Sequence, residues 1–470
     1  MVFSSIIFIY VFLPLVLFLY FIAEKTGLIW LKNTVLLLTS LLFYAWGGLK
    51  YLIMLLILCI INYICGLLIE RTTRRKLFLI IGLGADLLAL IFYKYLNFLV
   101  DNIENAAHAL GSADFSLGIP AIAMPIGISF FTFQIMSYLV DVYRNDVPAQ
   151  KNPAWLTLYV MMFPQLIAGP IVRYSDIDRE IASRHTTLKE VELGIKRFIV
   201  GFAKKVFLAN CMGSMADTIF AANGTTNTLY AWLGIGAYAL QIYFDFSAYS
   251  DMAIGLGMLF GFHFNENFNY PYISKSIQEF WRRWHISLSS WFRDYVYIPL
   301  GGNRKGTNRT YFNLFMVFLL TGIWHGAAWQ FVVWGLFHGA FMLVERVGFS
   351  KILKKLPGVV CHIYTLVVVL VAWVFFRADN LTIALQYIKT MFSFNFADFN
   401  NIDVLSKTNS MFILFGVISV LASTPLIKKL GTTKLASHTL LVDVGYLLLF
   451  VVSVIYLSGL SYNPFIYFKF

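Results

Sequence analysis

Apolar segments that approach or reach the length needed to cross a lipid bilayer recur along the whole chain. A helix needs roughly 20 apolar residues to span the hydrocarbon core. Hydrophobic residues fill 59% of the 470 positions and charged residues only 13%, which excludes a soluble globular domain of this size. The segments lie at about residues 2–22, 33–48, 51–69, 77–93, 119–140, 155–172, 198–221, 229–261, 311–324, 328–345, 359–376, 411–427 and 438–460. They predict an all-α, multi-pass membrane protein with about 11–13 membrane helices, some of them re-entrant or broken.

The charge of the chain indicates its topology rather than a nucleic-acid partner. The formal net charge is +12, and the basic residues lie mostly in short loops between apolar segments. This distribution follows the positive-inside rule. We therefore expect the lipid bilayer, and no nucleic acid, as a partner. No internal repeat or long linker is visible, so residues 1–470 are expected to form a single integral-membrane domain.

The segment from Trp155 to Val172 is expected to be a broken or re-entrant element. Basic residues lie on both sides of it, which places both ends on the cytoplasmic face. Pro164, Gly169 and Pro170 interrupt its helix. Irregular backbone at membrane depth is tolerated only where protein or a water-filled cavity surrounds it. The segment is therefore a first indication of an interior cavity.

A histidine, His325, is expected to lie inside the bilayer. The apolar run from Tyr311 to Ile323 leaves a basic loop and, at about 1.5 Å per residue, reaches roughly 20 Å into a core about 30 Å thick. An ionisable group at such depth is costly and is a candidate for function. From its position alone, His325 fits equally well a core histidine that bonds to a backbone carbonyl.

A second histidine, His338, follows in the stretch TGIWHGAAWQFVVWGLFHG, from Thr321 to Gly339. If this stretch is one helix, His338 points about 140° away from His325 and lies about 20 Å along the axis. This separation argues against a shared metal site, and no third ligand stands at a suitable spacing. No metal is therefore expected, and His338 is interpreted as a structural residue.

Arginines, a histidine and aromatic rings are combined in RRWHISLSSWFRDYVYIPLGG, from Arg282 to Gly302. In a single helix, Arg282 and Arg293 share one face about 16 Å apart, beside an aromatic face. Such a helix suits the inner membrane interface. Arginine forks also bind phosphates, such as those of coenzyme A. An interfacial anchor and a phosphate clamp are both compatible with this pattern.

Two carboxylates interrupt the apolar run YFDFSAYSDM, from Tyr243 to Met252. Asp245 and Asp251 could line a polar cavity, position an acceptor, or pair with buried basic groups. The pairing role is favoured, because buried charges are usually paired.

Five motifs of the chain resemble those of the membrane-bound O-acyltransferase family, and most closely those of its bacterial alginate O-acetyltransferase branch. They are FPQLIAGPI, YFDFSAYSDMAIGLG, FWRRWHISLSSWFRDYVYIPLGGN, TGIWHG and the terminal NPFIYFKF. They keep their order and extend over nearly the whole chain. The resemblance implies a ring of helices in the bacterial plasma membrane, pierced by a tunnel from a cytoplasmic donor side to an outer acceptor side.

The resemblance also implies roles for individual residues. His325 matches the catalytic histidine of the W-H-G motif, and His285 matches the second functional histidine. A histidine in a low-dielectric tunnel is expected to stay neutral and to accept the proton of an attacking hydroxyl. The other expected positions are tunnel-lining Trp284, Trp324, Asp245 and Gln165, and donor-binding Arg282, Arg283 and Arg293.

The implied reaction moves an acetyl group from a thioester to a hydroxyl group, for O-acetylation of a cell-surface polysaccharide or exopolysaccharide. Acetyl coenzyme A or an acyl carrier protein thioester is the expected donor substrate, and no tightly bound cofactor is expected. Similar bacterial systems relay the acetyl group to an extracytoplasmic transferase, so such a partner is implied. Relatives also acylate teichoic acids, lipids and proteins, which leaves D-alanyl transfer to teichoic acid as an alternative.

A proton-coupled transporter or flippase is an alternative of a different class. In that case His325 and Asp245 relay protons and the basic face binds an anion. Transporters often show two-fold internal repetition, with broken helices at matching positions. No such repetition is visible in the sequence, which favours an enzyme.

Overall fold

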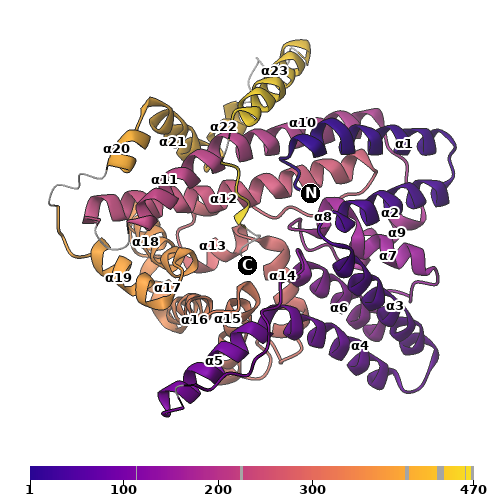
Figure 1. Ribbon diagram of the computed structural model, residues 1–470, viewed down its shortest axis with the longest axis horizontal. Coiled ribbons are helices and arrows are strands. Elements are labelled where there is room, and N and C mark those ends of the chain that lie inside the picture. Colours follow the sequence, from indigo (N-terminus) through magenta and orange to yellow (C-terminus); the bar gives the residue numbers. More distant parts are fainter. Residues whose placement is uncertain (113, 223–225, 397–401, 431–438, 461, 467–470) are drawn as a thin grey trace. The chain divides into compact units, whose positions relative to one another are not determined.

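The computed structural model describes residues 1–112, 114–222, 226–396, 402–430, 439–460 and 462–466 (Figure 1). All regular elements within these residues are helices, which confirms the predicted all-α class. The chain divides into two compact units, the first comprising Met1–Gly194 with Leu256–Asn265 and the second Ile195–Gly255 with Glu266–Phe470. The single domain expected from the sequence stays a prediction.

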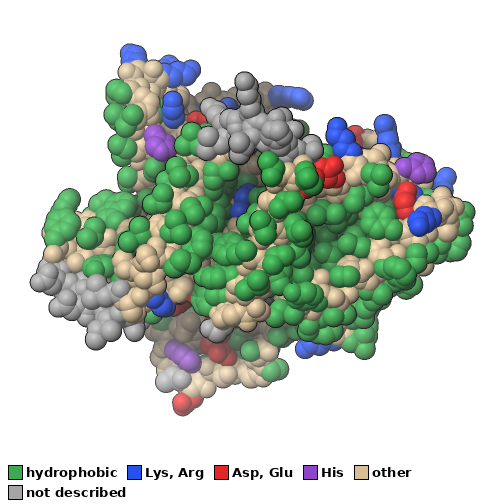
Figure 2. Space-filling model, turned by 90° about the horizontal axis from the view of Figure 1, so that it is seen from above, with side chains coloured by type: hydrophobic (Ala, Val, Ile, Leu, Met, Phe, Trp, Pro, Cys, Tyr) green, Lys and Arg blue, Asp and Glu red, His purple; other side chains and the backbone are tan. Residues whose placement is uncertain are grey.

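Seven of the described helical segments are long and apolar enough to cross a membrane, which confirms a multi-pass membrane protein. They are Phe8–Lys25, Leu49–Arg71, Arg75–Ala109, Leu188–Ala221, Trp329–Leu353, Gly358–Arg377 and Leu440–Ser458. Two shorter apolar helices cover Ile29–Ala45 and Ser410–Ala422. On the face drawn in Figure 2, hydrophobic side chains cover most of the described surface, as a lipid-facing surface requires.

The first unit is built from helices that pack in sequence order. Its elements are η1 (Phe8–Phe12), α1 (Leu13–Lys25), α2 (Ile29–Ala45), α3 (Leu49–Arg71), α4 (Arg75–Leu90), η2 (Ile91–Tyr95), α5 (Leu96–Ala109), α6 (Ile128–Arg144), α7 (Pro153–Met161), α8 (Phe163–Leu166) and α9 (Tyr174–Ala182). Helices α3, α4 and α6 pack against one another. Asn62 of α3 donates to the buried carboxylate of Asp86 on α4 at 2.7 Å, which joins two polar side chains inside an apolar bundle.

The segment from Trp155 to Val172 is broken, as the sequence indicates. Helix α7 begins at Pro153 after the N-cap Asn152, whose side chain accepts the N–H of Ala154. It ends at Met161, and the four-residue α8 follows. Residues 158–172 are all buried. Protein therefore surrounds the irregular backbone, which is the condition for such a break at membrane depth.

The second unit contains the longest helix and the motifs singled out above. Its elements are η3 (Lys204–Ala209), α11 (Asn210–Ala221), α12 (Thr228–Leu259), η4 (Pro271–Ile273), α13 (Ile277–Arg283), α14 (Ile286–Phe292), η5 (Arg293–Tyr297), α15 (Thr307–His325), α16 (Trp329–Val344), η6 (Glu345–Phe349), α17 (Ser350–Leu353), α18 (Gly358–Arg377), α19 (Leu381–Met391), α20 (Ile402–Lys407), α21 (Ser410–Ala422), α22 (Leu426–Leu430) and α23 (Thr439–Ser458). Helix α10 (Leu188–Ala203) and α12 contribute residues to both units.

The stretch from Thr321 to Gly339 is not one helix but the turn of a helical hairpin. Helix α15 ends at His325 and α16 begins at Trp329, and the two helices pack closely. A Cβ atom on Gly335 would lie 2.4 Å from the carbonyl oxygen of Phe318 and 2.8 Å from the Cα of Gly322. The two glycines therefore let the helix backbones touch. The 140° separation of His325 and His338, calculated for one helix, does not apply.

We predict that Gly335→Ala weakens this hairpin. The added methyl group meets backbone atoms of α15, which cannot move aside as a side-chain end can, so unfolding becomes easier by about 1–3 kcal/mol. Thermal unfolding of the purified protein in detergent should show a lower midpoint. Gly445→Ala in α23 is the matched control, because a Cβ there has no neighbour within 4 Å. An unchanged midpoint for Gly335→Ala would contradict the close contact.

Candidate active site

His325 lies at the C-terminal end of α15, buried among aromatic rings. Its ring centroid is 4.8 Å from that of Trp334 and 5.2 Å from that of Phe376, both in edge-on geometry. The side chain is 4% exposed. Gly326 follows directly, and a Cβ there would lie 2.2 Å from the ring of Phe331. The glycine of the W-H-G motif thus makes room for the ring that closes the hairpin beside His325.

The stretch from Arg282 to Gly302 does not form the single helix expected from its spacing. Helix α13 ends at Arg283, Trp284 is extended, and His285 has a left-handed backbone with φ of 44° before α14 begins. Such a conformation is uncommon for a residue with a side chain and occurs often at functional sites. The common face predicted for Arg282 and Arg293 is therefore wrong, because the helix is interrupted between them.

Asn267, on the loop after α12, holds His285 in this conformation. Its backbone oxygen accepts the N–H of Ile286 at 2.9 Å, and its side-chain oxygen accepts from His285 Nδ1 at 3.0 Å and from the Ser287 hydroxyl at 2.9 Å. Because an amide oxygen only accepts, His285 carries its proton on Nδ1. Burial lowers the pKa of His285 to about 3. The ring is therefore neutral at physiological pH, with its lone pair on Nε2.

The two histidines of the sequence motifs are brought together by one indole ring. The ring centroid of Trp324 in α15 lies 6.2 Å from that of His285 and 4.9 Å from that of His325. Phe246 of α12 covers His285 from another direction at 4.6 Å. Residues about 40 positions apart in the sequence thus share one water-poor aromatic site. We define the candidate active site as His285, Trp324 and His325.

His338 faces the same aromatic cluster from α16. Its centroid is 5.1 Å from that of Trp334, the ring that also contacts His325. Its Nδ1 accepts a hydrogen bond from Trp281 Nε1 at 3.4 Å. This bond supports the structural role that the sequence suggests.

Two expected tunnel-lining residues make contacts that stabilise the fold. Trp284 is buried and packs on Trp373 of α18, with centroids 4.9 Å apart. Gln165, in the first unit, donates its amide N–H to the carbonyl oxygen of Tyr159 at 2.6 Å. That carbonyl lies in the last turn of α7, where the helix can no longer satisfy it. Whether either side chain lines a tunnel stays a prediction.

Asp245, the third such residue, forms a buried ion pair. Its carboxylate lies 2.6 Å from Lys205 Nζ, and both side chains are almost fully buried. It also accepts the backbone N–H of Ile466 at 2.7 Å. Asp251, one and a half turns further along α12, bonds to Arg197 and Lys204. Both carboxylates thus have the pairing role that the sequence favours.

The three predicted donor-binding arginines have different surroundings. Arg282 is exposed. Arg283 pairs with Glu279 at 2.9 Å and donates to the carbonyl of Asn269. Arg293 is exposed and pairs with its neighbour Asp294 at 2.6 Å. Of these three arginines, only Arg293 lines a pocket that also reaches Thr321, one turn before His325.

This pocket is lined by basic and aromatic side chains. Its volume is about 220 Å³, and it runs between α14, α15 and α16. Arg293, Arg346 and Asn303 line it, with Arg346 donating to the Asn303 side chain at 2.7 Å. Thr321, one turn before His325, and Trp281 also line it. The sequence analysis did not select Arg346. Its only signal in the sequence is that it forms, with Glu345, the charged pair that follows the apolar run of α16.

Comparison with known proteins shows the family. Residues 131–387, which include both histidines and the pocket, match the model of the membrane-bound O-acyltransferase family. The chain is 42% identical to a probable alginate O-acetylase of Pseudomonas putida over the full length of both chains. It is 36% identical to a peptidoglycan O-acetyltransferase of Helicobacter pylori, over 84% of this chain and 80% of the relative.

A more distant match is a teichoic acid D-alanyltransferase of Bacillus subtilis, 31% identical over 52% of this chain and 65% of the relative. The family match and the acyltransferase names of the full-length relatives support an enzyme in a bacterial membrane. The chain therefore belongs to the membrane-bound O-acyltransferase family.

Proposed function

We propose that this enzyme transfers an acetyl group from a cytoplasmic thioester to a hydroxyl acceptor outside the membrane, for O-acetylation of a surface polysaccharide. The observation that carries the proposal is that two buried histidines, His285 and His325, both contact the ring of Trp324. The names of the relatives that cover most of the chain, an alginate O-acetylase and a peptidoglycan O-acetyltransferase, favour acetyl over D-alanyl transfer. The D-alanyltransferase matches only about half of the chain.

Donor binding is assigned to the pocket between α14, α15 and α16. The guanidinium groups of Arg293 and Arg346, which line this pocket, would hold the phosphates of the donor. The lining residues Phe318 and Thr321 of α15 would take the thioester arm towards His325. Acetyl coenzyme A and an acetylated carrier protein present the same arm, so both donors fit this assignment.

The proposed chemistry uses His325 as a general base, since a histidine in an apolar site is expected to stay neutral. His325 accepts the proton of the acceptor hydroxyl while the oxygen bonds to the thioester carbonyl carbon. The carbon–sulfur bond then breaks, the acetyl group remains on the acceptor oxygen, and the leaving sulfur takes up the proton as a free thiol. His285, with its lone pair on Nε2, would orient a reactant or assist this proton movement. Holding donor and acceptor in one site adds a proximity effect.

The acceptor would arrive through a passage from the outer side, completing a tunnel through the membrane. The first acceptor is proposed to be a serine of an extracytoplasmic acetyltransferase partner, which then modifies the polysaccharide. The relatives' names support a polysaccharide-modifying system.

We predict that His325→Ala lowers acetyl transfer by at least about 100-fold, because a general base is typically worth that much. Product O-acetylation and membrane abundance of the variant should be measured together. His338→Gln is the matched control, since it changes a buried histidine on the same aromatic cluster that already bonds to Trp281. Retained acetylation in His325→Ala, or an equal loss in the control, would contradict the assignment.

We predict that the double variant Arg293→Gln and Arg346→Gln raises the KM for acetyl coenzyme A about 3- to 10-fold, because one or two exposed charge-assisted contacts are lost. The kcat should change less, since neither side chain contacts the histidines. Steady-state kinetics with the purified enzyme give both constants. Arg282→Gln is the control, because Arg282 is exposed but does not line the pocket. An unchanged KM in the double variant would remove the donor assignment.

A further inference from the structure

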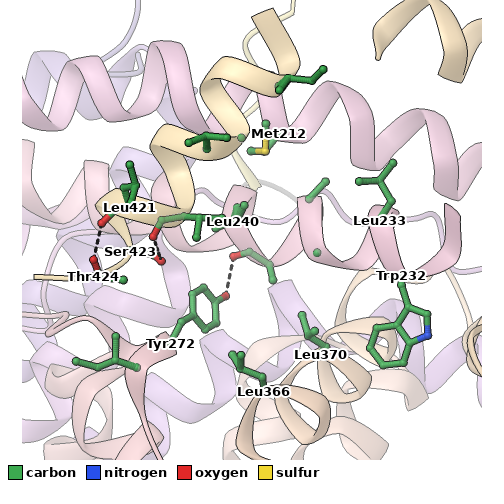
Figure 3. Close-up of a pocket in the computed structure, with 18 of the residues that line it drawn as sticks. Met212, Trp232, Leu233, Leu240, Tyr272, Leu366, Leu370, Leu421, Ser423 and Thr424 are labelled. Atoms are coloured by element: carbon green, nitrogen blue, oxygen red, sulfur yellow. Dashed lines mark hydrogen bonds between the residues drawn. The ribbon is translucent and has the colours of Figure 1, made fainter. Parts of the chain in front are cut away.

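A larger cavity lies in the second unit and is lined by no residue of the candidate active site (Figure 3). Its volume is about 720 Å³, within the roughly 300–1,000 Å³ of cavities that hold small molecules. Three helices form its walls: α12 with Leu233 and Leu240, α18 with Leu366 and Leu370, and α21. The lining residues repeat every three or four positions on each helix, so they form continuous apolar stripes.

Glycines leave part of this space open. Gly236 of α12 lines the cavity, and a Cβ there would have no neighbour within 4 Å. Gly416 of α21 also lines it, with only the end of the Met212 side chain within that distance, at 3.9 Å. Neither glycine has a positive φ or a close backbone contact. Helix packing therefore does not require glycine at these two positions, and the absence of their side chains enlarges the cavity.

The polar groups in the lining are already bonded within the protein. Tyr272 donates to the carbonyl of Ala239 at 2.6 Å, and Trp232 donates to that of Met391 at 2.9 Å. The hydroxyls of Ser423 and Thr424 each donate to a carbonyl three residues earlier in their own chain segment, as Figure 3 shows. His362 Nδ1 donates to the carbonyl of Ser274 at 3.2 Å. A ligand with polar groups would gain little here, whereas a hydrocarbon fits.

The cavity opens onto an apolar, exposed surface. Val417 and Val420 line it and are each 55% exposed, so α21 forms an open rim. Helix α18 is long and apolar enough to span the membrane, and α21 is an apolar helix of 13 residues. We therefore expect the acyl chains of the bilayer to surround this rim.

We propose that this cavity is a binding site for one acyl chain of a bilayer phospholipid, inserted between α12, α18 and α21. The chain leaves one apolar medium for another, so the gain comes from van der Waals contacts that an empty space would forfeit. Helix α21 also packs on α11 and η3. A bound chain would fill the gap on its other side and hold this short helix in place.

Photocrosslinking in a bilayer tests the proposal directly. The full-length protein is placed in phosphatidylethanolamine and phosphatidylglycerol vesicles that contain a phospholipid with a diazirine in the middle of one chain, and crosslinked residues are mapped by mass spectrometry. We expect adducts on the inner wall of the cavity, at Ala237 and Leu240, in addition to the outward-facing residues of α23. Filling the cavity with Gly236→Leu should reduce the inner-wall adducts at least fivefold and leave those on α23 unchanged.

Gly84→Leu in α4 is the matched control, because its Cβ would also have open space but outside the cavity. This variant should keep the inner-wall adducts. Membrane abundance and a single elution peak in detergent report folding for both variants, and Gly416→Leu provides a second filled cavity. Inner-wall adducts that are absent in the wild type, or unchanged in both filled variants, would overturn the proposal. If inner-wall adducts were lost only when a partner protein is co-expressed, the occupant of the cavity would be that protein rather than a lipid, and the proposal would be wrong.

Discussion

A backbone polar group that a helix break exposes inside the membrane must find its partner within the protein, and this constraint decides where the chain bends. At the break after α7, the side chain of Gln165 takes over the carbonyl of Tyr159. At the start of α13, the buried carboxylate of Glu345 accepts two backbone N–H groups, at 2.7 and 3.0 Å. At the start of α14, the backbone carbonyl of Asn267 accepts the N–H of Ile286. Each bend thus has its own partner, a side chain at the first two and a backbone carbonyl at the third.

The bends also explain how two histidines reach one ring. In the middle of a straight helix, the direction of a side chain is fixed by its position along the helix. His285 lies between two short helices and His325 at the last residue of α15, so neither direction is fixed in that way. The contact of Gly322 with Gly335 sets the distance of α16, and Trp334 of α16 then closes the site over His325. The functional geometry thus depends on breaks and glycines rather than on regular helices.

Periodicity and motifs predicted the helical class, the break near Pro164, and the two histidines that both contact Trp324. They failed where the backbone departs from a helix without a proline to signal it. The stretch around His285 consists of residues that all tolerate a helix, so its spacing predicted one helix. The left-handed residue there is imposed by Asn267, which lies 18 positions earlier and has no local signature. Pairing over such a distance cannot be deduced from one sequence.

Positive charge alone also could not identify a donor site, because most buried cations in the second unit serve the fold. Lys205 is neutralised by Asp245, and Arg197 by Asp251 and Glu266. A cation held by a buried carboxylate would have to give up that bond to bind a phosphate, which costs more than the new contact returns. Arg346 bonds to a neutral amide, that of Asn303, and Arg293 pairs with Asp294 while its own side chain is 62% exposed, so water screens this pair. Both guanidinium groups line the same pocket, which is why donor binding is assigned to it.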